Sequence, residues 1–240
     1  MAFLGIFGKK SDSAGLRKHA ERVANKRAQA YDRWESIQQL SNMRSKEAVE
    51  ALLPRFTFYV EPSITDQEEK DAVFSGIIES GAVGIEPVVA FMQRSGSISW
   101  AIKILDKIAP PDLVVAHLLA VLEKMDVEYE RDPERKNQIL STLAERKDPR
   151  IEAAVVRFLG DMNETVRFNT VAALSGQDAI ANQSQAIITC LCAEDSVRVR
   201  NRIFEALAIA KISVKPQDEP VKARLTANYT LDNAGVPKKK

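Results

Sequence analysis

The residues best suited to metal binding or nucleophilic catalysis are few and widely separated in this 240-residue chain. Cys190 and Cys192 stand two apart on a stretch of helical character, where their side chains point in different directions and cannot form a disulfide with each other. A closed metal site needs about four ligands, and neither His19 nor His117 lies near the cysteines in the sequence. We therefore expect two small core residues in a reducing compartment, and no metal site.

Motifs of the common enzyme classes are also missing from the sequence. It has no glycine-rich phosphate loop, no His-Glu-x-x-His motif and no serine nucleophile elbow. Carboxylates are abundant, but abundance on helix surfaces does not create the opposed pair that glycoside hydrolysis requires. We expect a protein that is not an enzyme and that needs no cofactor.

A tryptophan between two lysines is the first candidate binding feature. The helical period of residues 98–109 places Trp100 on the same polar side as Lys103 and Lys107. A tryptophan there offers a large contact area and a hydrogen-bond donor, as in binding hot spots. The alternative is that a neighbouring helix or loop covers Trp100, because large aromatic side chains are on average highly buried.

Two arginines one helical turn apart are the second candidate. Arg198 and Arg202 fall on one face of a predicted helix, with Glu205 close enough to offset Arg202. This face is either a contact for an acidic peptide or phosphate, or a solvated set of ion pairs that needs no partner. The acidic stretch over residues 66–71 similarly indicates a solvated helix start, favoured by the helix dipole.

The first ten residues combine apolar and basic side chains. The charges follow the apolar residues and no cleavage site comes after them, so the segment is not a secretory signal and we expect a cytoplasmic protein. Together with the basic helix that follows, it is suited to contact an anionic membrane surface. The alternative is a frayed terminus, or one folded back on the first helices. The candidate membrane contacts are Phe3, Leu4, Ile6, Phe7, Lys9 and Lys10.

One phrase that occurs twice indicates the elements that position these residues. Residues 166–174 and 199–207 each open with Val-Arg after a short acidic turn and close with a small residue and leucine, 33 residues apart. A helix, a turn and a second helix fit this offset. A unit of this size cannot bury its apolar face alone, so it must stack on its neighbours.

The same alternation of apolar helix, break and amphipathic helix predicts five helix pairs within residues 46–212. A flexible segment (1–13) and a long basic capping helix (14–45, helical to about 43) precede the pairs. A linker and a flexible basic tail over residues 213–240 follow them. The expected pairs are 47–58 with 66–79, 85–93 with 98–109, 112–125 with 134–145, 150–159 with 166–174, and 184–192 with 199–207.

These pairs resemble HEAT repeats, in which a Leu-Leu-Pro-type first helix is followed by an Asp-containing turn and a second helix opening Val-Arg. The match is closest in the last two pairs, and Lys136 replaces the arginine in the third. The resemblance implies an all-α fold, a right-handed α-α superhelix of about five HEAT-like pairs with an N-terminal capping helix. It also implies a structural ladder of ion pairs and turn hydrogen bonds between repeats, formed by Asp161, Arg167, Asp195 and Arg200.

In proteins of this family type the second helices line the concave face. Aligning the second helices on their closing leucines places Trp100, Gln138, Asn169 and Arg202 at equivalent positions. The resemblance therefore implies a scaffold or adaptor that binds another protein or peptide. The expected contact residues are Trp100, Lys103, Lys107, Gln138, Asn169, Arg198 and Arg202.

The distribution of charge along the chain distinguishes the remaining functional alternatives. Residues 1–46 and 135–240 are net positive and residues 47–134 net negative, an asymmetry that permits head-to-tail self-association. HEAT-like alkylpurine DNA glycosylases and phycobilisome-lyase-type proteins use related folds. Trp100 lies in the acidic region, where a DNA backbone would be repelled, and Trp34 lies on the cap. A membrane-peripheral adaptor is thus the first alternative, and a nucleic-acid-binding protein or glycosylase the second.

Overall fold

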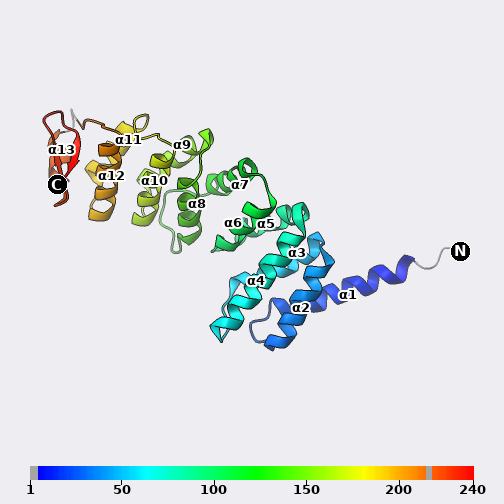
Figure 1. The fold of residues 1–240 in the computed structure, drawn as a ribbon. Coiled ribbons are helices and arrows are strands. Elements are labelled where there is room, and N and C mark those ends of the chain that lie inside the picture. Colours follow the sequence, from blue (N-terminus) through cyan, green and yellow to red (C-terminus); the bar gives the residue numbers. More distant parts are fainter. Residues whose placement is uncertain (1–4, 215–217) are drawn as a thin grey trace. The chain divides into compact units, whose positions relative to one another are not determined.

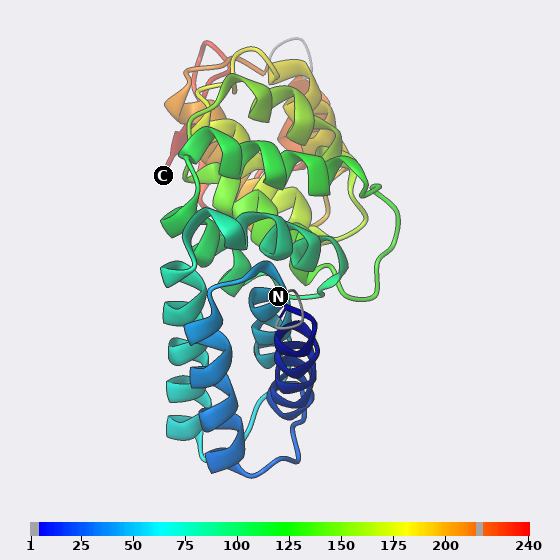
Figure 2. The same ribbon diagram turned by 90° about the vertical axis from the view of Figure 1, so that its right-hand side faces the viewer.

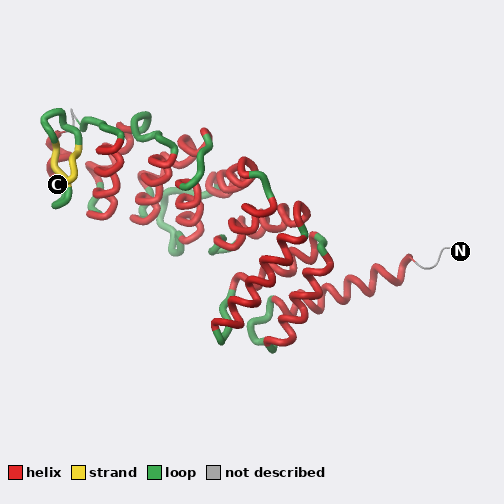
Figure 3. Tube along the Cα trace, viewed as in Figure 1, coloured by secondary structure: helices red, strands yellow, loops and turns green. Residues whose placement is uncertain are grey.

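The computed structural model describes residues 5–214 and 218–240, with side chains at residues 14–214 and 219–240. This part of the chain is predominantly helical, with one short β-hairpin near its C-terminal end (Figure 3). The all-α expectation is confirmed. The chain divides into two compact units, residues 1–114 and 115–240, and the boundary falls within α7 (Pro111–Glu123).

In the first unit, α2 (Ala30–Met43) packs against both α1 (Gly5–Val23) and α4 (Ser63–Glu79), shown in blue to cyan in Figure 2. α3 (Lys46–Leu52) continues as a 3-10 turn over Leu53–Thr57 and packs against α5 (Ile85–Arg94). A second 3-10 turn, Gly81–Gly84, precedes α5, and α6 (Ser99–Ile108) packs on α4 and α5. The fully buried core residues include Val23, Ile37, Leu40, Leu52, Val73, Ile77, Val88 and Ile104.

The prediction of one long helix over residues 14–43 was wrong in its continuity. The chain breaks after Val23, and the Asn25 side chain accepts a hydrogen bond from the backbone N–H of Arg27 at 2.9 Å. Such a side-chain turn competes with helix. The reversal lets α1 lie along α2, so that Val23 joins the core of Ile37 and Leu40.

In the second unit, α10 (Glu164–Gly176) lies between α8 (Glu134–Ala144) and α12 (Val197–Ile209), as Figure 1 shows. α9 (Pro149–Val155), with a 3-10 turn over Val156–Gly160, and α11 (Ser184–Ala193) are the first helices of their pairs. Asn163 and Ser196 cap α10 and α12 by accepting backbone N–H groups of the first turn. Each helix predicted for the five pairs has a counterpart in the structure.

The prediction of a flexible basic tail was wrong for residues 218–240. This segment forms α13 (Asp218–Ala223) and an antiparallel hairpin of β1 (Tyr229–Leu231) and β2 (Pro237–Lys239). Asp232 closes the turn by accepting the N–H groups of Ala234 and Val236, each at 2.9 Å. β2 packs on α12, and the Tyr229 ring stacks on Phe204 with centroids 5.5 Å apart. The centre of the expected linker, residues 215–217, lies outside the described residues.

Among the described residues, no single helix has the length and apolar character needed to cross a membrane. The pair Ser63–Glu79 and Gly81–Arg94 passes that criterion only when its two helices, bent by 117°, are taken together.

Close packing of α8 against α10 generates a stability prediction. A Cβ at Gly176 would lie 2.3 Å from the Ala144 carbonyl oxygen, whereas a Cβ at Gly160 would meet nothing within 4 Å. We expect Gly176→Ala to lower the free energy of unfolding by roughly 1–3 kcal/mol, because backbone must shift. Thermal unfolding of both variants checks this. Gly160→Ala is the matched control, and equal midpoints for the two variants would contradict the close approach.

Candidate functional site

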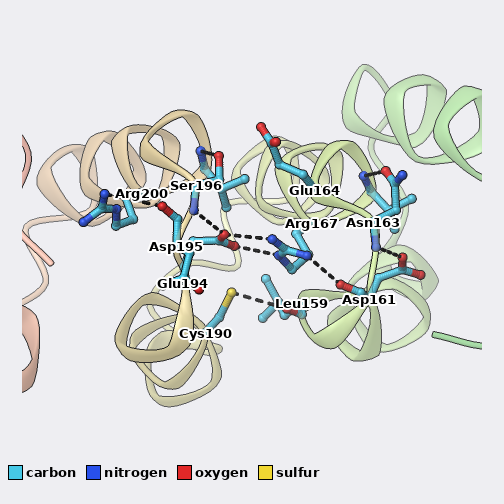
Figure 4. Close-up of polar contacts among 12 residues, drawn as sticks. Leu159, Asp161, Asn163, Glu164, Arg167, Cys190, Glu194, Asp195, Ser196 and Arg200 are labelled. Atoms are coloured by element: carbon cyan, nitrogen blue, oxygen red, sulfur yellow. Dashed lines mark hydrogen bonds and ion pairs between the residues drawn. The ribbon is translucent and has the colours of Figure 1, made fainter. Parts of the chain in front are cut away.

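Two buried ion pairs form a ladder between successive second helices and turns of the second unit. Lys136 Nζ on α8 lies 2.8 Å from Asp161 Oδ2, and both side chains are 1% exposed. On α10, Arg167 donates from Nε and Nη2 to the two carboxylate oxygens of Glu194, at 2.6 and 2.8 Å (Figure 4). Each acid also accepts a backbone N–H, Asp161 from Asn163 and Glu194 from Ser196. Each ion pair therefore joins a second helix to the cap of the next one.

The ladder departs from the sequence expectation at Asp195. Glu194, and not Asp195, is the partner of Arg167, while Asp195 pairs with Arg224 at 2.8 Å and keeps its side chain 92% exposed. Arg200 donates to the carbonyl oxygens of Arg224 and Asp195, at 3.2 and 3.5 Å. Glu194 stands 33 residues after Asp161, the offset of the repeated phrase, and this spacing is the signal that identifies it.

The environment of Glu194 shifts the pKa of its carboxyl group. Burial raises the pKa of this carboxyl, but the hydrogen bonds from Arg167 and from the Ser196 backbone outweigh burial, so the pKa is lowered overall. The folded state therefore gains stability from ionised Glu194 above the ordinary glutamate pKa. That contribution is lost as the pH falls through the lowered pKa of the folded state.

A shallow groove on the α10–α12 side brings the two candidate arginines together. The Cζ atoms of Arg198 and Arg202 lie 4.1 and 5.9 Å from the centroid of the Phe168 ring. Each arginine also contacts a carboxylate, Arg202 with Glu205 at 2.8 Å and Arg198 with Glu164 at 3.7 Å. We call this groove, with a volume of about 270 Å³, the arginine groove. Its lining is Phe168, Arg198, Asn201, Arg202, Glu205, Asn228, Tyr229 and Lys239.

The other predicted contacts of the second unit are already engaged within the chain. Gln138 donates to Glu134 Oε1 at 2.6 Å, and Asn169 donates to Asn137 Oδ1 at 3.2 Å. Both side chains are half-buried. Sequence reasoning missed Phe168 and the hairpin residues, because the hairpin segment reads as a tail.

In the first unit, Trp100 is half-buried in an aromatic cluster. Its ring stacks on Phe56 with centroids 5.0 Å apart and meets Phe74 edge-on at 5.8 Å. Lys103 Nζ lies 4.8 Å from the Trp100 centroid, and Lys107 is exposed on the same helix. Trp100 is therefore partly covered, as the alternative expected, while remaining next to exposed cations.

Two acids of the stretch at the start of α4 are buried, where a solvated surface was predicted, while Glu68 and Asp71 are exposed. Glu69 accepts from Arg33 and Arg55, and Asp66 accepts from Arg55 at 2.8 Å. These four side chains are at most 7% exposed. The prediction was wrong at Asp66 and Glu69, because the arginine partners lie on other elements. For the predicted membrane contacts, Phe3 and Leu4 lie outside the described residues, and Ile6, Phe7, Lys9 and Lys10 belong to α1 without described side chains.

The side chains with catalytic potential, His19, Ser36 and Cys190, all make contacts within the fold. His19 Nδ1 lies 3.1 Å from Ser36 Oγ, but Ser36 is fully buried, so this serine cannot meet a substrate. Burial raises the pKa of the Cys190 thiol to about 11, and the thiol donates to the Leu159 carbonyl (Figure 4). Within the described residues, no three His, Cys, Asp or Glu side chains gather as metal ligands would.

No protein-family model, curated protein or solved structure matches this chain.

The ladder predicts that loss of a buried ion pair lowers the free energy of unfolding more than loss of an exposed one. Lys136→Ala leaves the Asp161 carboxylate buried without its cation, and we expect a loss of about 3–5 kcal/mol in unfolding free energy. The control Lys147→Ala removes an exposed partner of Asp178, and pairs of that kind contribute about 0–1 kcal/mol. Denaturant unfolding measures both. Losses of similar size would contradict the structural role of Lys136.

The second ion pair gives a test of the corrected residue assignment. We expect Glu194→Gln to destabilise the protein at pH 7 and to flatten its acid unfolding curve, because the variant no longer loses a stabilising carboxylate as the pH falls. Asp195→Asn, one residue away and exposed, should change neither property appreciably. A larger effect of Asp195→Asn would restore the original assignment.

Proposed function

We propose that this chain is a non-catalytic, cytoplasmic scaffold or adaptor that binds another protein, built from HEAT-like helix pairs wound into a right-handed α-α superhelix. The repeated ion pairs Lys136–Asp161 and Arg167–Glu194 support the repeat, because successive pairs use the same contact at nearly the same offset. The side-by-side packing of α8, α10 and α12 is also what a stack of such repeats requires.

The arginine groove is the proposed binding surface, and its two guanidinium groups held over one Phe168 ring carry the proposal. Contacts with Phe168, Glu164 and Glu205 restrict these long side chains before a partner arrives. Less conformational entropy is then lost on binding. Arginines and aromatic rings are also enriched among residues that dominate binding energy. In the first unit, Trp100 with Lys103 is a separate proposed contact.

A comparative capture experiment tests this function. The full chain is immobilised, and the proteins retained from a lysate of the source cells are quantified for wild type, Arg198→Ala/Arg202→Ala and Arg150→Ala. Arg150 matches the groove arginines because it is exposed and pairs with a nearby acid, Asp148 at 2.7 Å, on a first helix.

We expect at least one protein to be retained by wild type and Arg150→Ala but reduced about tenfold with the groove variant, because charge-assisted contacts are lost. Identical retained sets for all three proteins would contradict the use of the groove. Trp100→Ala, measured in parallel, reports on the first unit.

A further inference from the structure

We infer that the arginine groove binds an extended segment of a partner protein that carries acidic side chains at alternate positions, Glu-x-Glu or its Asp equivalent. This inference rests on the proposed protein-binding function and specifies its ligand. The spacing of the groove cations, the charge of the lining and the coverage of its rings support it.

The spacing of the two arginines matches an extended chain. Arg198 and Arg202 are four residues apart on α12, which corresponds to a rise of about 6 Å. In an extended peptide, side chains at alternate positions lie on the same side, about 6.6–6.8 Å apart. Two carboxylates in a Glu-x-Glu segment can therefore face the two guanidinium groups at once, whereas adjacent carboxylates point to opposite sides.

The groove also has the charge and the donors for such a segment. Its lining holds three cations, Arg198, Arg202 and Lys239, against one carboxylate, Glu205. Contacts with the described residues engage Nη1 of both guanidinium groups. Nη2 of each remains for a carboxylate, and Arg–carboxylate hydrogen bonds are among the stronger ones in proteins.

The aromatic rings of the groove argue for a peptide over a nucleic acid strand. Binding of single strands depends on open ring faces on which bases stack. Here the Arg198 guanidinium covers Phe168, and Tyr229 is 6% exposed with its ring against Phe204.

The chain itself has acids at alternate positions at 66/68 and 69/71, and at every second position of residues 126–134 around the exposed Tyr129. Every such pair includes an acid that is already engaged within its own unit. Asp66 and Glu69 are buried against Arg55, Glu130 lies 3.5 Å from Lys136 Nζ, and Asp126 and Asp132 accept the backbone N–H of the second residue after them. A second copy would have to give up one of these contacts to enter the groove, so a partner protein is the better occupant.

Isomeric peptides test the inference on the full chain. Fluorescein-labelled Gly-Ser-Glu-Ala-Glu-Ser-Gly and Gly-Ser-Glu-Glu-Ala-Ser-Gly have the same composition and charge, and binding is followed by fluorescence anisotropy at low salt. We expect the alternate-acid peptide to bind about tenfold more tightly, because only it engages both arginines. Equal affinities would reduce the interaction to general charge attraction and overturn the inference.

Variants assign the binding to the groove. Arg198→Ala and Arg202→Ala should each weaken binding of the alternate-acid peptide about tenfold, and Arg202→Lys should restore only part of it, because lysine lacks the planar fork. Arg150→Ala is the control and should bind as wild type does. Unchanged affinity in both groove variants, with folding verified by circular dichroism, would overturn the inference.

Two further measurements exclude other occupants. Tighter binding of an oligothymidylate than of the alternate-acid peptide would overturn the inference in favour of nucleic acid. A salt-sensitive dimer in sedimentation, lost in both Arg202→Ala and Glu128→Ala, would assign the groove to a second copy and overturn the partner assignment. If neither peptide binds but groove variants still lose captured proteins, the inference fails and the proposed function stands.

Discussion

A charge buried between one helix pair and the next is the constraint on which the second unit depends. Lys136 and Asp161 are almost completely inaccessible, and Glu194 is 1% exposed beneath Arg167. A buried charge without its partner is strongly destabilising, so Lys136 and Arg167 must each meet the acid of the following turn. Misaligned stacking of the pairs would leave such charges unpaired. The ion pairs therefore contribute specificity of register, whatever their net contribution to stability.

The same acids set the start of the helices that carry the arginine groove. Glu194 accepts the N–H of Ser196, which in turn caps α12 through Val199. The first turn of α12 is thus fixed relative to α10, and Arg198 on that turn is brought over Phe168. The ion-pair ladder on one side of the helices therefore determines the geometry of the arginine groove, the candidate binding surface on another side.

The ladder ends at Arg200, where the chain supplies carbonyl oxygens and Arg224 in place of another acid. α13 and the hairpin follow, and β2 packs on α12. Tyr229 stacks against Phe204 and covers this side of α12. The hairpin thus covers part of α12 and also contributes Lys239 to the groove.

The helices were predictable from the sequence because apolar periodicity is a local property, and the repeated phrase identified the second helices. Contacts between side chains that are distant in the sequence could not be predicted. In the sequence Asp66 and Glu69 have the pattern of solvated acids, but in the fold Arg33 and Arg55 from other elements form buried ion pairs with them. The hairpin was missed because each strand is only three residues long and two of the three residues of β2 are lysines. The break after Val23 was missed because its turn depends on the Asn25 side chain. Arg198 and Arg202 were identified from the sequence. The contact of both with the Phe168 ring could not be, because it depends on the packing of α10 on α12.

A double-mutant cycle across Arg167 and Glu194 tests the central claim that the buried ion pair joins successive helix pairs. The free energy of unfolding is measured at pH 7 for wild type, Arg167→Met, Glu194→Gln and the double variant. The coupling free energy should be about 2 kcal/mol or more, within the range found for residues in direct contact. A coupling below about 0.5 kcal/mol, as for independent sites, would contradict the account.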